Sequence, residues 1–99
     1  MAKGYWIAHV TITDAERYAG YQHHAPKAFA EYGARFVARG GDSTTLEGDP
    51  WQRHVIIEFD SKERALACYA SQAYQMARQQ REGACHASVT ITEGLSDSG

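Results

Sequence analysis

Cysteine, proline and the usual motifs of cofactor sites are scarce or missing in this sequence of 99 residues. It contains two cysteines and two prolines. Two cysteines are too few for a disulfide scaffold, and the spacing of Cys68 and Cys85 matches no zinc-binding pattern. His23 and His24 are neighbours, and neighbouring side chains on a helix point about 100° apart, too far to share a metal. A phosphate loop, a dinucleotide fingerprint and a Gly-x-Ser-x-Gly motif are also absent. We therefore expect two free thiols in a cytoplasmic protein without a cofactor or a metal.

A large net charge and long apolar runs are missing as well. The formal net charge of −2 provides no basic surface for a nucleic-acid backbone, so we expect no nucleic-acid partner. No run approaches the roughly 20 apolar residues that a membrane-spanning helix requires, and residues 5–12 have the composition of a strand, not a signal peptide. We expect no membrane partner. Without linkers or repeats, residues 1–99 are assigned to one domain, with a core over about 4–94 and a flexible tail over 95–99.

What the sequence does contain is an ordered series of strand and helix patterns. Runs rich in β-branched and aromatic residues predict strands, and apolar residues at three- and four-residue steps predict helices. The predicted strands are 5–12, 34–39, 54–59 and 86–93, with a further extended piece at 44–47. One helical region precedes the second strand, and another lies between the third and the fourth. The resulting order, βαββαβ, is that of a ferredoxin-like α+β fold with an antiparallel sheet.

Capping residues mark where the helices begin. Thr13 and Glu16 have the spacing of a capping box, and Asp14 also suits the start of a helix, while Ser61 and Ser71 can cap the later helical patterns. Ser71 divides the second helical region into two segments. Pro26 interrupts the first helical region, and it predicts either a kink or two abutting helices.

Side-chain alternation divides the predicted strands into two faces. Right-handed crossovers place both helical regions on one face of the sheet. To that face we assign Trp6, Ala8, Val10, Ile12, Phe36, Ala38, Val55, Ile57, Phe59, Ala87, Val89 and Ile91. To the open face we assign Tyr5, Ile7, His9, Arg35, Val37, Arg39, His54, Ile56, Glu58, Ser88 and Thr90. The open face mixes apolar and polar side chains, which is typical of a surface that meets a partner subunit or a ligand.

Two side chains on the open face are candidates for proton transfer. His9 lies in the middle of a strand, and an imidazole can gain or lose a proton near neutral pH. Glu58 is the one acid in its strand, and a half-buried carboxyl with a raised pKa can serve as a base. The alternatives are a histidine held at a dimer interface and a glutamate paired with an arginine.

A second group of candidates would bind an anion. Arg39 precedes Gly40 and Gly41, which predict a bulge or bend, and an arginine beside such a bend can offer its guanidinium together with backbone donors. His54 lies at the mouth of the neighbouring strand. The alternative is an inter-strand or inter-subunit salt bridge from Arg39 to Glu58 or Glu47. Arg81 either holds a helix to the sheet or reaches the mouth of a cleft. The helical tyrosines are expected to be packing residues: Tyr18, Tyr21, Tyr32, Tyr69 and Tyr74.

Six segments of the chain resemble one family. They are GYWIAHVTITD, YGARFVARGG, LEG, VIIEF, CYASQAYQMARQQR and ITEG. On these segments, from about Gly4 to Gly94, the chain is similar to the domain-of-unknown-function 1330 family. The resemblance implies a homodimer in which two sheets face each other as a dimeric α/β barrel. It implies no particular reaction, because relatives of this barrel include cofactor-free monooxygenases, isomerases and haem enzymes.

Two functional hypotheses follow. In the first, the homodimer binds or converts a small anionic organic molecule without a tightly held cofactor. The cleft would lie between the sheet and the helices or at the barrel seam, with Arg39 holding the anion and His9 or Glu58 moving a proton. In the second, the protein is a non-catalytic dimeric module, and the same side chains form a polar network between subunits.

Overall fold

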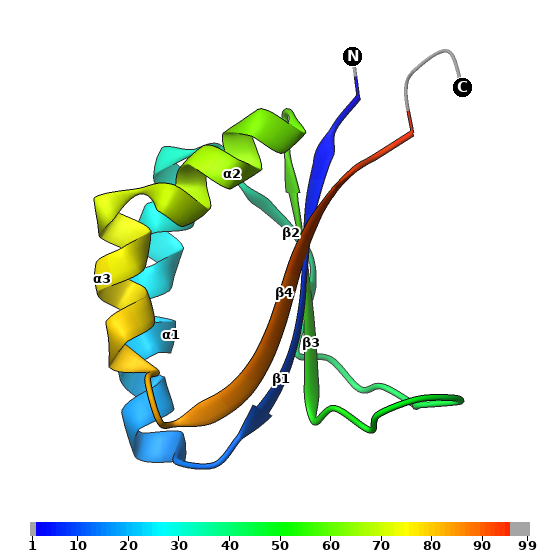
Figure 1. Ribbon diagram of the computed structural model, residues 1–99, viewed down its shortest axis with the longest axis vertical. Helices are drawn as coiled ribbons and strands as arrows, with labels where there is room; N and C mark the ends of the chain where they lie inside the picture. The colour runs from blue at the N-terminus through cyan, green and yellow to red at the C-terminus, as the bar shows by residue number, and fades with distance from the viewer. Residues whose placement is uncertain (1, 96–99) are drawn as a thin grey trace.

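A four-stranded antiparallel sheet with helices on one face makes up the protein. The computed structural model describes residues 2–95. Its elements are β1 (Gly4–Ile12), α1 (Ala15–Glu31), β2 (Arg35–Arg39), β3 (Arg53–Phe59), α2 (Lys62–Ala70), α3 (Gln72–Gln80) and β4 (Cys85–Glu93). The strand order is β2-β3-β1-β4, and the helices lie together on one side of the sheet (Figure 1). The predicted ferredoxin-like α+β fold is therefore confirmed. Of the expected tail, residues 96–99 lie outside the described part.

The three helices begin after Asp14, Ser61 and Ser71, and the predicted capping box from Thr13 to Glu16 is wrong because Asp14 caps α1 instead. The side chains of Asp14, Ser61 and Ser71 each accept a hydrogen bond from the backbone N–H three residues later, at 3.1 Å in every case. Pro26 lies inside α1, which is one continuous helix of 17 residues. The alternative of two abutting helices is therefore wrong. The physical reason is that Ala25 and Phe29, on either side of the proline, are both buried in the core, and such packing stabilises a helix more than local propensity does.

Trp6 of β1 is the centre of the hydrophobic core. Its side chain is 1% exposed. The Trp6 ring lies 5.0 Å from the ring of Phe29 in α1 and 4.9 Å from that of Tyr74 in α3, both edge to face. It also stacks on Phe59 of β3 at 6.1 Å. Such aromatic contacts fasten α1 and α3 to the same face of the sheet. The prediction that the tyrosines pack is confirmed for Tyr74, which is fully buried.

A bulge in β2 changes which side chains face the helices. The pairing of β2 with β3 shifts by one residue between Phe36 and Ala38. One extra residue reverses the alternation of the side chains that follow it. Arg39 therefore pairs with Val55 and lies on the helix-covered face, while Ala38 lies on the open face. The prediction for Arg39 and Ala38 is wrong for this reason. A bend follows at Gly40, as predicted, with a φ of 69°.

Residues 40–52 connect β2 to β3 and project away from the helices (Figure 1). The extended piece predicted at 44–47 belongs to this loop and forms no strand. None of the helices within residues 2–95 has the length and apolar character needed to cross a bilayer.

Candidate functional site

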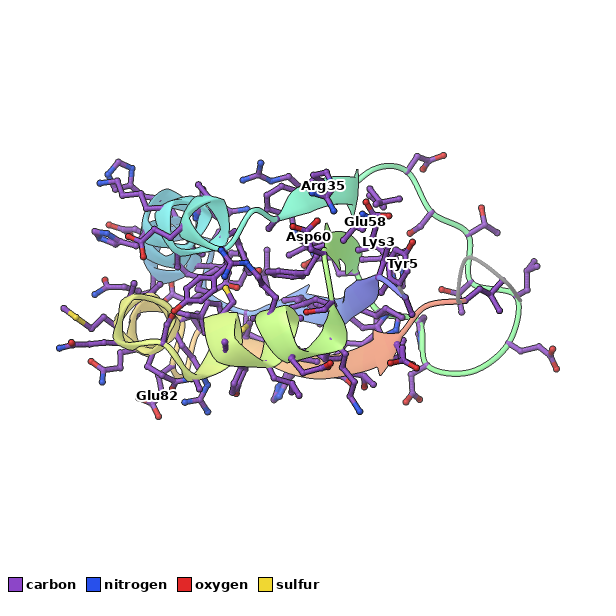
Figure 2. The ribbon with its side chains drawn as sticks, turned by 90° about the horizontal axis from the view of Figure 1, so that it is seen from above. Lys3, Tyr5, Arg35, Glu58, Asp60 and Glu82 are labelled. Atoms are coloured by element: carbon purple, nitrogen blue, oxygen red, sulfur yellow. The ribbon has the colours of Figure 1, made fainter. Side chains whose placement is uncertain are left out.

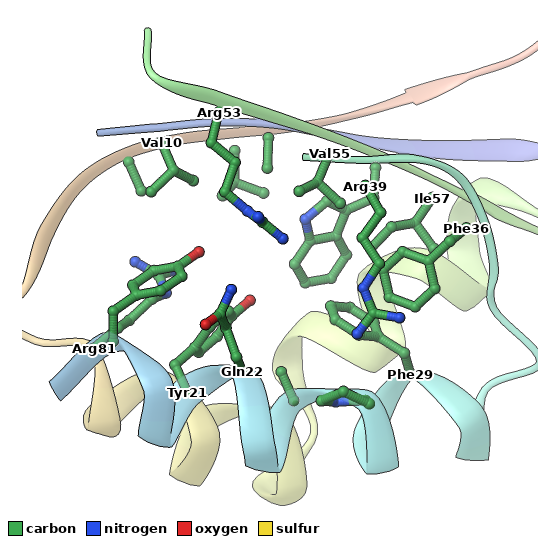
Figure 3. A pocket seen from close by; sticks show the side chains of 17 residues that line it. Val10, Tyr21, Gln22, Phe29, Phe36, Arg39, Arg53, Val55, Ile57 and Arg81 are labelled. Carbon is green, nitrogen blue, oxygen red and sulfur yellow. The ribbon is translucent and has the colours of Figure 1, made fainter. Parts of the chain in front are cut away.

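A cavity lies between the helix-covered face of the sheet and the helices (Figure 3). Its volume is about 50 Å³, several times the ~10–15 Å³ that one water molecule requires. One wall is apolar and includes the side chains of Trp6, Phe29, Phe36, Val55 and Ile57. The polar side chains are Tyr18, Tyr21, Gln22, Arg39, Arg53 and Arg81. Because three arginines reach it, we call this cavity the arginine cleft.

The arginines come from three separate elements. Arg39 ends β2, Arg53 begins β3 and Arg81 follows α3. The lining contains no aspartate, glutamate or histidine among the residues that the structure describes. Three guanidinium groups beside an apolar wall give the cleft a strong positive potential, which attracts an anion. The polar part of the cleft is therefore cationic, and the rest of its lining is apolar or uncharged.

Arg53 enters the cleft from the start of β3. Its side chain extends from β3 toward Tyr21 and Gln22 on α1 (Figure 3). Within residues 2–95, its Nε atom is buried and has no hydrogen-bond partner. A buried donor without a partner is costly, and an acceptor brought by a ligand or a water would relieve that cost.

Arg39 lies at the other end of the cleft. Its guanidinium stacks over the Phe36 ring, 4.0 Å from the ring centroid. This cation–π contact orients the arginine along the apolar wall. The alternative of a salt bridge from Arg39 to Glu58 is wrong, because Glu58 lies on the other face of the sheet and pairs with Arg35.

Arg81 joins two tyrosines beside the cleft. Its Nη2 donates to the hydroxyl of Tyr74 at 3.3 Å, and its guanidinium lies 5.1 Å from the centre of the Tyr21 ring. Burial raises the pKa of Tyr18 and, with a further contribution from Tyr74, the pKa of Tyr21. Both phenols that line the cleft are therefore neutral donors at physiological pH.

The two predicted glycines have different surroundings. Arg53 Nη1 lies so close to the Cα of Gly40 that a Cβ there would overlap it, and the positive φ of Gly40 is itself unfavourable for other residues. A Cβ at Gly41 would have no neighbouring atom within 4 Å, and the φ of Gly41 is not positive. Gly40 thus makes room for an arginine of the cleft, and Gly41 has no comparable contact.

Glu58 belongs to an ion-pair network on the open face (Figure 2). Its carboxylate accepts from Arg35 Nε and from the Tyr5 hydroxyl, both at 2.9 Å. Arg35 also donates to Asp60 at 3.0 Å. The hydrogen bond from Arg35, followed by that from Tyr5, lowers the pKa of Glu58. The predicted raised pKa is therefore wrong, and the alternative of an arginine partner is correct, with Arg35 as that partner.

His9 and His54 face each other across β1 and β3 on the same open face. Their Nδ1 atoms are 2.8 Å apart, so one ring donates a hydrogen to the other. The pair lies in a hollow of about 450 Å³ under the β2–β3 loop, close to Trp51 and Glu47. The structure therefore brings the two histidines together but separates them from Arg39.

The sequence patterns did not predict that Arg53, Tyr21 and Gln22 belong to one site. A signal for Arg53 was present, because it alternates with Val55 and Ile57 and so shares their face of the sheet. When an arginine at the start of a strand shares the face of the core residues, the pattern indicates a charged group on the helix-covered side of the sheet. Tyr21 and Gln22 gave no such signal, since their position opposite Arg53 depends on how α1 crosses the sheet.

The fold and the cleft define the class of protein, a ferredoxin-like α+β domain with a cationic cavity between sheet and helices. The sequence profile described as domain of unknown function 1330 matches residues 3–95. The chain belongs to that family, as its sequence segments predicted. It matches none of the curated proteins with which it was compared.

Solved structures share the fold at low sequence identity. A protein of unknown function from Rhodopseudomonas palustris is 19% identical, with a TM-score of 0.78 over 96% of this chain and 84% of that one. A dimeric ferredoxin-like protein of unknown function from Thermobifida fusca is 12% identical, with a TM-score of 0.63 over 93% and 91%. A cofactor-independent oxygenase from Streptomyces nogalater is 8% identical, with a TM-score of 0.62 over 97% and 96%. At these identities the likeness concerns the fold alone.

Proposed function

We propose that the protein binds a small organic anion in the arginine cleft, with the anionic group held by Arg53. The observation that carries this proposal is the buried Nε of Arg53, which has no partner within residues 2–95. A carboxylate can accept two parallel hydrogen bonds from one guanidinium, and its charge suits a cavity that three arginines line. The ligand's apolar part would contact the wall formed by Trp6 and Phe36.

The lining also limits the chemistry that the cleft can perform. It offers cations and neutral donors, and within the described residues it contains no carboxylate or imidazole to act as a base. Groups of this kind bind an anion and stabilise negative charge on it. The proposal is therefore a binding site that can polarise its ligand, and it requires no tightly held cofactor.

We also propose that two subunits pair through the open face. Ile7 and Ile56 lie next to each other on that face, and Val37 is 62% exposed. Covering such side chains stabilises a dimer by ~1.5–3 kcal/mol for each one fully buried. The description of the similar Thermobifida fusca protein as dimeric supports this assembly. A non-catalytic dimeric module would share this interface but would leave the cleft without a specific ligand.

The decisive experiment is a titration of the ¹⁵N-labelled protein with a panel of short carboxylates, followed by NMR. We expect saturable shifts in residues around the cleft, and a loss of about 10- to 100-fold in affinity for Arg53→Met, because it removes a charge-assisted hydrogen bond. Arg78→Met is the matched control, since Arg78 is exposed on α3 and bonds only to Gln75 among the described residues. If no carboxylate binds, or Arg53→Met binds as well as the unaltered protein, the proposal is wrong.

The contact between His9 and His54 favours a second candidate function, acid–base chemistry on the open face. Two imidazoles whose Nδ1 atoms are 2.8 Å apart can share one proton, and the hollow beside them has room for a ligand. Glu58, the other predicted base, would then serve to hold the strands together. Histidine-selective NMR of the assembled protein tests this candidate. It fails if pairing of subunits fills the hollow and shields both rings from added ligands.

A further inference from the structure

The hydroxyl of Tyr74 lies between two residues that line the arginine cleft, Arg81 and Tyr21. Tyr74 is fully buried in the core. Within residues 2–95 its hydroxyl oxygen has two hydrogen-bond partners, Arg81 Nη2 at 3.3 Å and the Tyr21 hydroxyl at 3.0 Å. Arg81 follows α3 and Tyr21 belongs to α1, and both side chains line the cleft.

The chemistry of the three groups fixes the direction of the chain. A guanidinium can only donate hydrogen bonds, so the Tyr74 oxygen accepts from Arg81. The Tyr74 hydrogen then needs an acceptor, because leaving a buried hydroxyl unsatisfied is costly. Tyr21 is the one acceptor that the described residues place within reach. The Tyr74 hydroxyl therefore donates to Tyr21, and the oxygen of Tyr21 is an acceptor in this bond.

The hydrogen of Tyr21 is consequently free to point elsewhere. The Tyr21 side chain extends into the cleft toward Arg53 and beside Gln22 (Figure 3). Burial raises its pKa, so the phenol keeps this hydrogen at physiological pH. A chain of donors that begins at a cation also polarises each successive O–H bond. Tyr21 is thus held as a donor aimed into the same cavity as Arg53.

We infer that the arginine cleft selects oxo-carboxylates, whose carboxylate binds Arg53 while the carbonyl oxygen accepts the hydrogen of Tyr21. This inference rests on the proposed function, since it assumes that Arg53 holds the anion. A carbonyl oxygen can only accept, which suits the O–H of Tyr21 that the Arg81–Tyr74–Tyr21 chain leaves available to donate into the cleft. The cavity of about 50 Å³ suits a compact ligand in which the two acceptor groups are close together.

Matched pairs of ligands that differ by one carbonyl test the inference. The probes are pyruvate with propionate, and acetoacetate with butyrate, titrated by NMR. We expect each oxo acid to bind up to about tenfold more tightly than its partner, as one additional hydrogen bond allows. In Tyr21→Phe, the ratio of the oxo-acid affinity to the simple-acid affinity should fall close to one, while simple carboxylates still bind. Tyr32→Phe, which removes a hydroxyl outside the cleft lining, should keep the ratio unchanged.

Tyr74→Phe tests the role of the chain itself, because Tyr74 acts only as a positioning residue. It removes the donor that holds the Tyr21 oxygen, so we expect a smaller ratio of oxo-acid to simple-acid affinity, a change that a merely structural role would not produce. If this variant does not fold, the Tyr21→Phe ratio remains the deciding measurement.

Binding of carboxylates without any preference for oxo acids, or a preference that survives in Tyr21→Phe, overturns this inference alone. Absence of all carboxylate binding overturns the proposed function as well.

Discussion

The guanidinium of Arg53 lies directly against the Cα of Gly40, in the space that a side chain would occupy at that position. The two residues are brought together by pairing of the strands, because the N–H of Gly40 donates to the carbonyl of His54 at 2.9 Å. Gly40 also has a φ of 69°, in the left-handed region. The glycine after β2 therefore helps to set the position of the arginine that we place in the anion site.

Gly40→Ala is expected to reduce both stability and anion binding. The left-handed backbone costs of order 1–3 kcal/mol for a residue with a side chain, and the new methyl displaces the Arg53 guanidinium. Denaturant unfolding and carboxylate titration measure the two effects. Gly41→Ala is the control, since nothing lies near its Cα and its φ is not positive. Equal carboxylate affinity in the two variants would show that Gly40 does not position Arg53.

Glu58→Gln is expected to make the free energy of unfolding less sensitive to pH in the acid range. The hydrogen bond from Arg35 lowers the pKa of Glu58 in the folded state. The ionised Glu58 carboxylate therefore stabilises the fold above the unfolded pKa of about 4.3, and this stabilisation is lost as the pH falls through the folded pKa. The unaltered protein should therefore lose stability more steeply below about pH 5 than the variant does. Urea unfolding across this range checks the slope. Glu82→Gln, at the other end of the molecule (Figure 2), should retain the steep slope.

Ile56→Glu is expected to convert the proposed dimer into a monomer. Ile56 lies next to Ile7 on the open face, and a charge buried between two sheets would be left without a partner. Sedimentation should give about twice the 11.0 kDa chain mass for the unaltered protein and a single chain mass for the variant. Met76→Glu alters a side chain on α3 that is 58% exposed, and it should remain dimeric. A monomeric unaltered protein at micromolar concentration would contradict the proposed assembly.

The two free thiols are expected to react at very different rates. Burial raises the pKa of Cys68 to about 12, so almost no reactive thiolate forms at neutral pH. Cys85 is only half-buried. A thiol-specific reagent should modify Cys85 first in the native protein and both residues after denaturation, with Cys85→Ser as the control. Rapid modification of Cys68 in the folded Cys85→Ser variant would show that the core opens more readily than its packing indicates.

Much of the fold could be predicted because it depends on local signals. The capping side chains of Asp14, Ser61 and Ser71 act within one helical turn of their own position, and each begins a helix as expected. The alternation of Trp6, Ala8 and Val10 has the period of a strand with one buried face. Together with the order of these elements, such signals were enough to specify the ferredoxin-like topology.

The candidate site was harder to predict, because it depends on contacts between distant segments. The bulge before Arg39 exists only in the pairing of β2 with β3, and it moves that arginine to the opposite face from the one that simple alternation predicts. The tertiary structure likewise decides that Tyr21 on α1 meets Tyr74 on α3, 53 residues away. Local sequence patterns specified which helices and strands form and, apart from the end of β2, which of their faces are buried. Only the packing of α1 and α3 on the sheet, driven by the aromatic core around Trp6, decided that Arg53, Tyr21 and Arg81 line one cavity.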